Sequence, residues 1–107
     1  MKIVTWNING VKARMGAMMK WLEDVKPDIV CLQEIKVVDE EFPRLEIEAM
    51  GYNVETFGQK SWNGVAILAR GHEPVVTATA LPGDDADTQA RYIEAAVNGV
   101  VIASLYA

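Results

Sequence analysis

The chain has 107 residues, half of them hydrophobic, with four prolines and eight glycines. This composition indicates one globular domain and excludes a disordered, collagen-like or solenoid protein. Ten Lys and Arg against fifteen Asp and Glu give a net charge of −5, which argues against a protein that holds nucleic acid by bulk charge alone. The single cysteine, Cys31, excludes a disulfide framework and a CxxC metal site and favours a reducing, cytoplasmic location. We expect no signal peptide and no membrane span.

The first predicted elements are a strand and a helix. Residues 2–7 are mostly β-forming and show no helical period, so they predict a strand over 2–7, and Asn9 and Gly10 prevent it from continuing. From residue 11 the apolar side chains recur at steps of three and four, which predicts an amphipathic helix over residues 11–26. The helix should end before Pro27, which disfavours helical backbone in the residue that precedes it.

A second strand is predicted over residues 28–33, because this short apolar run is typical of a strand that is buried on both faces. A strand, a helix and a strand in this order predict a parallel, right-handed unit. Asn7 and Glu34 then lie at the carboxyl ends of neighbouring strands. Open α/β sheets bind ligands at such strand ends, so we expect a site there.

The rest of the chain is predicted to be mainly antiparallel. Residues 42–50 indicate a short amphipathic helix closed by Gly51, and residues 82–87 form an acidic, turn-rich segment. Asn98-Gly99 is a strong hairpin signal between two apolar runs. The remaining strands are predicted over residues 52–57, 64–69, 75–80, 92–97 and 100–105.

Several motifs occur in a characteristic order: T-W-N-I-N-G, L-Q-E-I-K, G-Q-K followed by W-N-G-V-A-I-L, and P-G-D-D followed by an arginine. Together they resemble the exonuclease III branch of the endonuclease/exonuclease/phosphatase superfamily, the abasic-site repair nucleases. The resemblance runs from Met1 to Tyr106. Members of this branch are considerably longer, so residues 1–107 are expected to be the amino-terminal half of such a domain, as a fragment.

The resemblance implies an α/β fold that is half of a four-layer α/β sandwich. We expect one mixed β-sheet with helices on its outer face. The inner face of that sheet would then be exposed, and an exposed apolar patch of this kind normally finds a partner. The fragment is therefore expected to self-associate or to pair with a carboxyl-terminal half.

The implied function is that of a DNA repair nuclease, an exodeoxyribonuclease III-like AP endonuclease. It would hydrolyse phosphodiesters 5′ to abasic sites and remove nucleotides 3′ to 5′ from double-stranded DNA, with Mg²⁺, or Mn²⁺, as cofactor. The family's proton donor and base lie in the absent half, so the fragment alone is expected to be inactive. The alternative is a noncatalytic α/β module that binds DNA or a protein partner through the same face. Phosphatase and deadenylase members fit less well, and no Rossmann or P-loop motif occurs.

The resemblance also implies a metal site at Glu34 and Asn7. A carboxylate is the ligand that a hard divalent cation needs to neutralise charge on a phosphodiester. Without the resemblance, Glu34 would be read as a surface residue. Asn7 is expected to contact the metal or a substrate phosphate, and Asn9, where relatives carry Asp, to serve turn geometry. The missing carboxylate at position 9 disfavours a two-metal site.

The remaining candidates contact the substrate. Tyr106 matches the family's catalytic tyrosine near the scissile phosphate, although a tyrosine at a strand end equally fits a packing role. Lys36 either orients a carboxylate near the metal or is a solvated charge. Trp62 and Arg91 match DNA contacts of the family, or pack locally. His72, the only histidine, is expected to be a plain surface residue.

Overall fold

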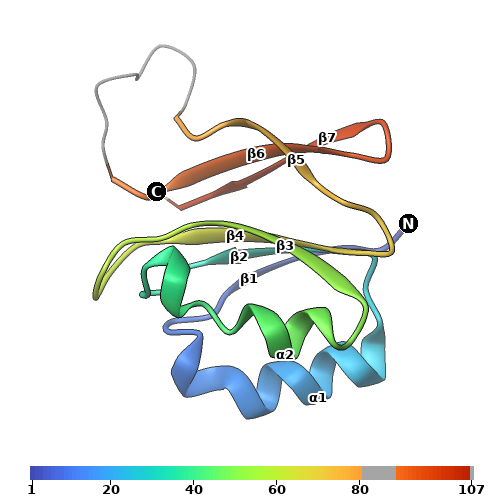
Figure 1. The fold of residues 1–107 in the computed structure, drawn as a ribbon, viewed down its shortest axis with the longest axis horizontal. Coiled ribbons are helices and arrows are strands. Elements are labelled where there is room, and N and C mark those ends of the chain that lie inside the picture. The colour runs from blue at the N-terminus through green and yellow to red at the C-terminus, as the bar shows by residue number, and fades with distance from the viewer. Residues whose placement is uncertain (81–88, 107) are drawn as a thin grey trace.

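The computed structural model describes residues 1–80 and 89–106. In this part of the chain, seven strands form two sheets that pack face to face (Figure 1). The helices of the described residues lie against the outer face of the four-stranded sheet. The layers therefore run helices, four-stranded sheet, three-stranded sheet.

The four-stranded sheet has the order β1-β2-β4-β3. β1 (Ile3–Asn7) pairs in parallel with β2 (Ile29–Gln33), which confirms the predicted parallel unit. β4 (Val65–Arg70) lies antiparallel to both β2 and β3 (Tyr52–Phe57). Every residue of β2 is buried, as expected for an apolar strand covered on both faces.

The three-stranded sheet has the order β5-β6-β7 and is antiparallel throughout. It consists of β5 (Val75–Ala78), β6 (Tyr92–Val97) and β7 (Val100–Leu105). Asn98 and Gly99 join β6 to β7 with φ angles of 49° and 82°. Two positive φ angles in a two-residue loop are what a hairpin turn of the favoured hand requires, so the predicted hairpin is confirmed.

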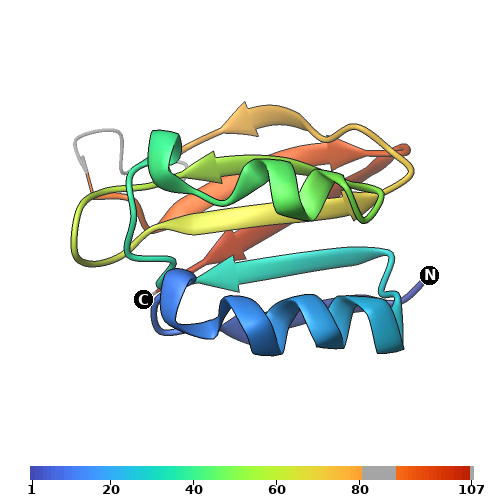
Figure 2. The same cartoon turned by 60° about the horizontal axis from the view of Figure 1, so that its bottom comes forward.

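Helical segments cover the outer face of the four-stranded sheet (Figure 2). η1 (Lys12–Arg14) leads directly into α1 (Met15–Val25), which ends at Lys26 in the left-handed conformation. The second helical region divides into η2 (Asp39–Glu41) and α2 (Arg44–Glu48). α2 is shorter than the predicted 42–50 because Pro43 restricts Phe42 to extended backbone.

Two apolar cores result from this layering. The first joins the helices to the four-stranded sheet and contains Met18, Leu22 and Leu68. The second lies between the sheets, where β2 and β4 face β6 and β7. Its buried members are Ile29, Cys31, Val65, Ile67, Ala69, Ile93, Ala95, Val97 and Ile102.

The expected single mixed sheet with an exposed inner face is corrected by this second core. The chain turns after β4, at Gly71, and its later strands pair with one another on top of the four-stranded sheet instead of extending it. Apolar side chains on both faces of β2 and β4 permit this second layer. The class, α/β with helices on an outer face, is confirmed.

The exposed apolar surface therefore lies elsewhere. Val75, Ala96 and Val101 form one cross-strand row on the outer face of the three-stranded sheet. Val75 is 62% exposed and Val101 is 65% exposed. No helix in the described part of the chain covers this face (Figure 1). No helix among the described residues is long and apolar enough to cross a membrane.

Strand boundaries agree with the predictions to within two residues. β1 starts at Ile3, β4 runs one residue further to Arg70, and β5 ends at Ala78. The predicted acidic segment 82–87 lies outside the described residues.

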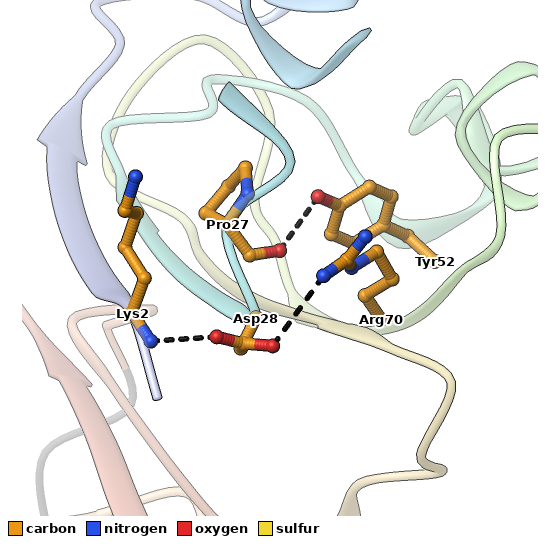
Figure 3. Close-up of polar contacts among 5 residues, drawn as sticks. All are labelled: Lys2, Pro27, Asp28, Tyr52 and Arg70. Carbon is orange, nitrogen blue, oxygen red and sulfur yellow. Dashed lines mark hydrogen bonds and ion pairs between the residues drawn. The ribbon is translucent and has the colours of Figure 1, made fainter. Parts of the chain in front are cut away.

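The end of the four-stranded sheet at which β1 and β2 begin is closed by side chains (Figure 3). The Asp28 carboxylate accepts a hydrogen bond of 2.6 Å from the Lys2 backbone N–H and lies 3.6 Å from the Arg70 guanidinium. The buried Tyr52 hydroxyl donates to the Pro27 carbonyl at 2.7 Å. These contacts join β1, β2, β3 and β4 at this end.

Candidate active site

The candidate site lies at the opposite end of the sheet, at the carboxyl ends of β1 and β2. Asn7 is the register partner of Gln33, and the Ile8 N–H continues the ladder to the Gln33 carbonyl at 3.0 Å. Glu34 follows Gln33 directly. The structure thus places Asn7 and Glu34 at the same edge, as their positions after neighbouring parallel strands predicted.

The backbone around this edge adopts left-handed conformations at residues other than glycine. Asn9, Glu34 and Lys36 have φ angles of 50°, 56° and 60°. The Gly10 N–H donates to the Glu34 carbonyl at 2.8 Å, and the Lys36 N–H donates to the Asn63 carbonyl at 3.0 Å. Backbone of this kind costs free energy and persists where its surroundings hold it, often at functional sites.

The backbone conformation and the close packing at position 64 explain why a glycine, Gly64, follows Trp62-Asn63. Its φ is 92°, and a Cβ added there would lie 2.5 Å from Cγ1 of Ile35. The Gly64 carbonyl accepts from the Ile35 N–H at 3.2 Å, and the Gly64 N–H donates to the Ala90 carbonyl at 2.7 Å. This glycine lets the segment after β2 approach the segments before β4 and β6.

A pocket of about 490 Å³ opens among these segments. The structure brings five of the six predicted site residues together there. Asn7 is not in the lining and lies on the neighbouring strand. The pocket is lined by Glu34, Lys36, Ser61, Trp62, Asn63, Gln89, Arg91 and Tyr106.

Lys36 is held by the side chain of Asn9. Its ammonium donates to Oδ1 of Asn9 at 2.5 Å. Asn9 therefore combines the predicted turn conformation with a contact that the sequence did not reveal. Lys36 and Glu34 both line the pocket, so the bond holds a positive charge in the same pocket as the carboxylate.

Arg91 and Tyr106 are neighbours across the ends of β6 and β7. The Tyr106 N–H donates to the Arg91 carbonyl at 2.8 Å. In the described part of the chain, Nε of Arg91 is the buried side-chain nitrogen that lacks a hydrogen-bond partner. A buried cationic donor without an acceptor is costly, so this part of the pocket favours an anion.

Sequence reasoning missed the residues that tie the pocket loops together. Oε1 of Gln59 accepts from Nδ2 of Asn63 at 3.1 Å and from the Ala90 N–H at 2.8 Å. Gln59 thus joins the loop after β3 to the segment that leads into β6. The G-Q-K motif contained this signal, but one sequence does not show which backbone a glutamine reaches.

Two other predicted residues lie at the surface. Trp62 sits at the rim of the pocket and is 67% exposed. His72 is exposed in the turn after β4, and its carbonyl accepts from Nδ2 of Asn53 at 2.8 Å.

Comparison with known proteins identifies the family. Residues 4–106 match the model of the endonuclease/exonuclease/phosphatase family. The chain belongs to this family. The match covers nearly the whole chain and confirms the family resemblance that the sequence motifs indicated.

Individual relatives are longer than this chain. It is 44% identical over 95 residues to exodeoxyribonuclease III of Haemophilus influenzae, which covers 89% of this chain and 35% of that protein. A 3′ phosphatase from Neisseria, solved with a product DNA hairpin, has a TM-score of 0.93 at 40% identity. An AP endonuclease from Archaeoglobus fulgidus has a TM-score of 0.91 at 34% identity. These structures match 99% of this chain, which spans 41% and 40% of theirs.

The donor set fits a hard divalent cation such as Mg²⁺ or Mn²⁺ better than Zn²⁺. No group of three or more His, Cys, Asp or Glu able to hold a metal occurs in the described part of the chain. Mg²⁺ needs one or two carboxylates and keeps several water ligands, whereas Zn²⁺ needs three or four protein ligands. Glu34 with an amide oxygen from Asn7 satisfies the first pattern only.

Cys31 does not supply a nucleophile to the candidate site. Cys31 is buried between the sheets, and burial raises the pKa of its thiol to about 11. A thiol in this state is not a nucleophile at neutral pH.

Proposed function

We propose that this chain carries the metal- and phosphate-binding half of a DNA repair nuclease of the exodeoxyribonuclease III type. Its activity would be Mg²⁺-dependent hydrolysis of phosphodiesters 5′ to abasic sites, together with 3′ to 5′ exonuclease action. Mn²⁺ would serve as an alternative cofactor to Mg²⁺. The names of the relatives support this proposal: exodeoxyribonuclease III, AP endonuclease and a 3′ phosphatase bound to product DNA.

One observation carries the proposal. Among the residues that the structure describes, the pocket combines one carboxylate, Glu34, with the cations Lys36 and Arg91 and the phenol of Tyr106. Nε of Arg91 is buried without a protein acceptor. A phosphodiester with a divalent cation would supply an acceptor oxygen for Arg91, a further acceptor for Lys36 besides Asn9, and a positive charge for Glu34.

Each side chain then has a task. Glu34 and Asn7 would hold the cation, which when bound would neutralise charge that develops on the phosphate oxygens. Arg91 and Lys36 orient the phosphate by donating to its other oxygens. Tyr106 donates from its hydroxyl to the same group, and this interaction strengthens as charge develops.

Contact with the rest of the nucleic acid falls to Trp62. An exposed indole at the rim of a phosphate pocket suits stacking on a base or packing against a sugar. The local cations Lys36 and Arg91 supply positive charge at this face, although the chain as a whole is acidic.

Assembly and location complete the proposal. The outer face of the three-stranded sheet, with Val75, Val101 and Leu105 exposed, is the surface through which the chain would self-associate or pair with a carboxyl-terminal half. We place the protein in the cytoplasm, because the single cysteine is buried and unpaired and suits a reducing compartment.

A complementation assay tests the proposal. Purified 1–107 is incubated with a duplex containing one abasic site and Mg²⁺, with and without the segment that follows the matched region in the Haemophilus influenzae relative. We expect nicking only when that segment is present, because the described part of this chain has one carboxylate and no histidine at the pocket. Light scattering on the same sample measures self-association.

Three results would contradict parts of the proposal. Metal-dependent nicking by 1–107 alone would contradict the dependence on a second half. A well-behaved monomer would contradict self-association. DNA binding without cleavage by the longest natural chain that carries this sequence would favour the noncatalytic binding module.

A further inference from the structure

A hydrogen-bonded group adjoins the pocket residues in sequence; two of its members, Gln33 and Ser104, are buried, and the third, Thr5, is exposed. Nε2 of Gln33 donates to Oγ1 of Thr5 at 2.9 Å and to Oγ of Ser104 at 3.1 Å, and it lies 3.3 Å from the carbonyl of Cys31. The Ser104 hydroxyl donates to the Leu32 carbonyl at 2.9 Å. Gln33 is 8% exposed and Ser104 is 1% exposed. We call Thr5, Gln33 and Ser104 the bridge.

The bridge connects three strands from two sheets at the points where they enter the site. Thr5 precedes Asn7 by two residues on β1, and Gln33 directly precedes Glu34 at the end of β2. Ser104 lies on β7, two residues before Tyr106, which follows the end of that strand. Since a strand advances about 3.3 Å per residue, each bridge residue is within about 7 Å, along its strand, of a candidate site residue.

The directions of the hydrogen bonds determine how the Gln33 amide lies. Ser104 has a single hydroxyl proton, which it donates to Leu32, so its oxygen can only accept from Gln33. The Gln33 amide must therefore present its NH₂ group to β7. In this orientation the same NH₂ group also donates to Thr5. The Gln33 side chain therefore links β1 to β7.

These polar groups lie at the end of an otherwise apolar interface. The neighbouring inter-sheet residues, such as Ile67, Ile93 and Ile102, pack without hydrogen bonds from their side chains. Burying an amide and a hydroxyl costs free energy, and their hydrogen bonds do little more than offset this cost. Apolar side chains at these positions would therefore join the two sheets equally well. What the bridge adds is a defined distance and direction between the strand ends.

We propose that Gln33 and Ser104, with Thr5, are positioning residues that set the separation of Asn7, Glu34 and Tyr106. This inference rests on the proposed function. Ser104 acts through Tyr106, on the phosphate, and Thr5 acts through Asn7, on the metal. Gln33 couples the two and also aligns Glu34, the residue that follows it.

The two arms of the bridge can be cut separately in the longest natural chain that carries residues 1–107. Ser104→Ala removes the link to β7 and leaves Gln33 bonded to Thr5. We expect kcat for an abasic duplex to fall about tenfold to a hundredfold with KM and Mn²⁺ affinity unchanged, because a misplaced reacting group costs rate and not binding. Thr5→Val cuts the other arm and should weaken Mn²⁺ binding about tenfold. Thr5→Ser keeps the hydroxyl and should bind Mn²⁺ with wild-type affinity.

Matched controls separate positioning from stability. Ile102→Val removes one methylene from the same interface and the same strand as Ser104. As the control for Thr5, Thr77→Val removes a hydroxyl from β5 of the three-stranded sheet, where it donates to Glu94 at 2.6 Å. Both controls should keep wild-type kcat and Mn²⁺ affinity, even where thermal unfolding shows lower stability.

The outcomes are distinct from those of the proposed function. If wild-type protein cleaves and both bridge variants lose only thermal stability, the bridge is structural and the inference is overturned. If wild-type protein binds Mn²⁺ without cleaving, the proposed function fails, and the Thr5→Val affinity still decides the metal arm. Wild-type protein that neither cleaves nor binds Mn²⁺ would overturn both.

Discussion

The two ends of the four-stranded sheet use similar polar side chains in opposite ways. Where β1 and β2 begin, Asp28 is hydrogen-bonded to Lys2 and paired with Arg70, and Tyr52 donates to Pro27 (Figure 3). This end is satisfied by its own contacts.

Where β1 and β2 end, polar groups surround a pocket and an arginine keeps a buried nitrogen without a partner. Left-handed backbone at residues such as Glu34 and Lys36 adds to the cost of this end. At the first end the carboxylate pairs with the arginine and the tyrosine reaches a backbone carbonyl, so these residue types stabilise the sheet. At the second end the same three residue types line a pocket instead.

The largest expected effect is on Glu34. In the longest natural chain that carries this sequence, Glu34→Ala should lower Mg²⁺-dependent cleavage of an abasic duplex by at least about a hundredfold, because the metal loses its carboxylate. Circular dichroism should show an unchanged fold. Glu34→Gln keeps the shape without the charge and should be equally impaired, whereas Glu23→Gln, on the exposed surface of α1, should be active. Near-normal cleavage by Glu34→Ala would refute the metal site.

The second effect is on Tyr106. Tyr106→Phe should lower kcat about a hundredfold with little change in DNA affinity, because the hydroxyl acts mainly on charge that develops in the transition state. Single-turnover kinetics together with fluorescence anisotropy separate the two quantities. Weaker binding with normal kcat would contradict the assignment.

The third prediction concerns the closed end. Tyr52→Phe leaves the Pro27 carbonyl without its donor and should lower the free energy of unfolding by about 1 to 2 kcal/mol, without changing activity. Tyr92→Phe is the matched control, since the Tyr92 hydroxyl donates to Glu94 on the second sheet and its loss should cost less. Urea denaturation of both variants measures the difference. Equal losses would mean that burial of the Tyr52 hydroxyl contributes nothing specific.

The smallest effect is electrostatic. The hydrogen bond from the Lys2 backbone, aided by Arg70, lowers the pKa of Asp28 below its usual value. A carboxyl whose pKa is lower in the folded state stabilises the fold above its unfolded pKa of about 4, and this stability disappears as pH falls through the folded pKa.

Asp28→Asn should therefore destabilise the protein slightly at pH 7 and progressively less as the solution becomes more acidic. Asp24→Asn, which removes the same charge from the exposed pair with Lys20, is the control and should show little effect. A wild-type advantage over Asp28→Asn that does not change with pH would contradict the role of the carboxylate charge.

Much of the fold could be predicted because the local signals are strong. The β1–β2 unit follows from two apolar runs on either side of an amphipathic helix, and the β6–β7 hairpin follows from Asn98-Gly99. The division into two sheets could not be predicted in this way. Strands paired by antiparallel ladders look alike whether they extend a sheet or begin a new layer, and only the packing of side chains such as Ile67 against Ile93 distinguishes the two.

The candidate site divides in the same manner. Asn7 and Glu34 could be placed at one edge from sequence, because parallel strands bring their carboxyl ends together. Tyr106 and Arg91 were singled out only through the family motifs. The contact of Lys36 with Asn9 and the role of Gln59 as a loop tie join residues distant in sequence, and no local pattern encodes such contacts.

The sequence by itself determined the α/β class, the parallel unit, the hairpin and the candidate residues at the strand ends. These depend on hydrophobic period, turn chemistry and motif order, which are properties of short segments. Only the tertiary structure decided that a second sheet covers the first, that Nε of Arg91 is buried without a hydrogen-bond partner, and that Gln33 joins β1 to β7. Those features depend on which distant side chains meet, and that is settled by packing three layers at once.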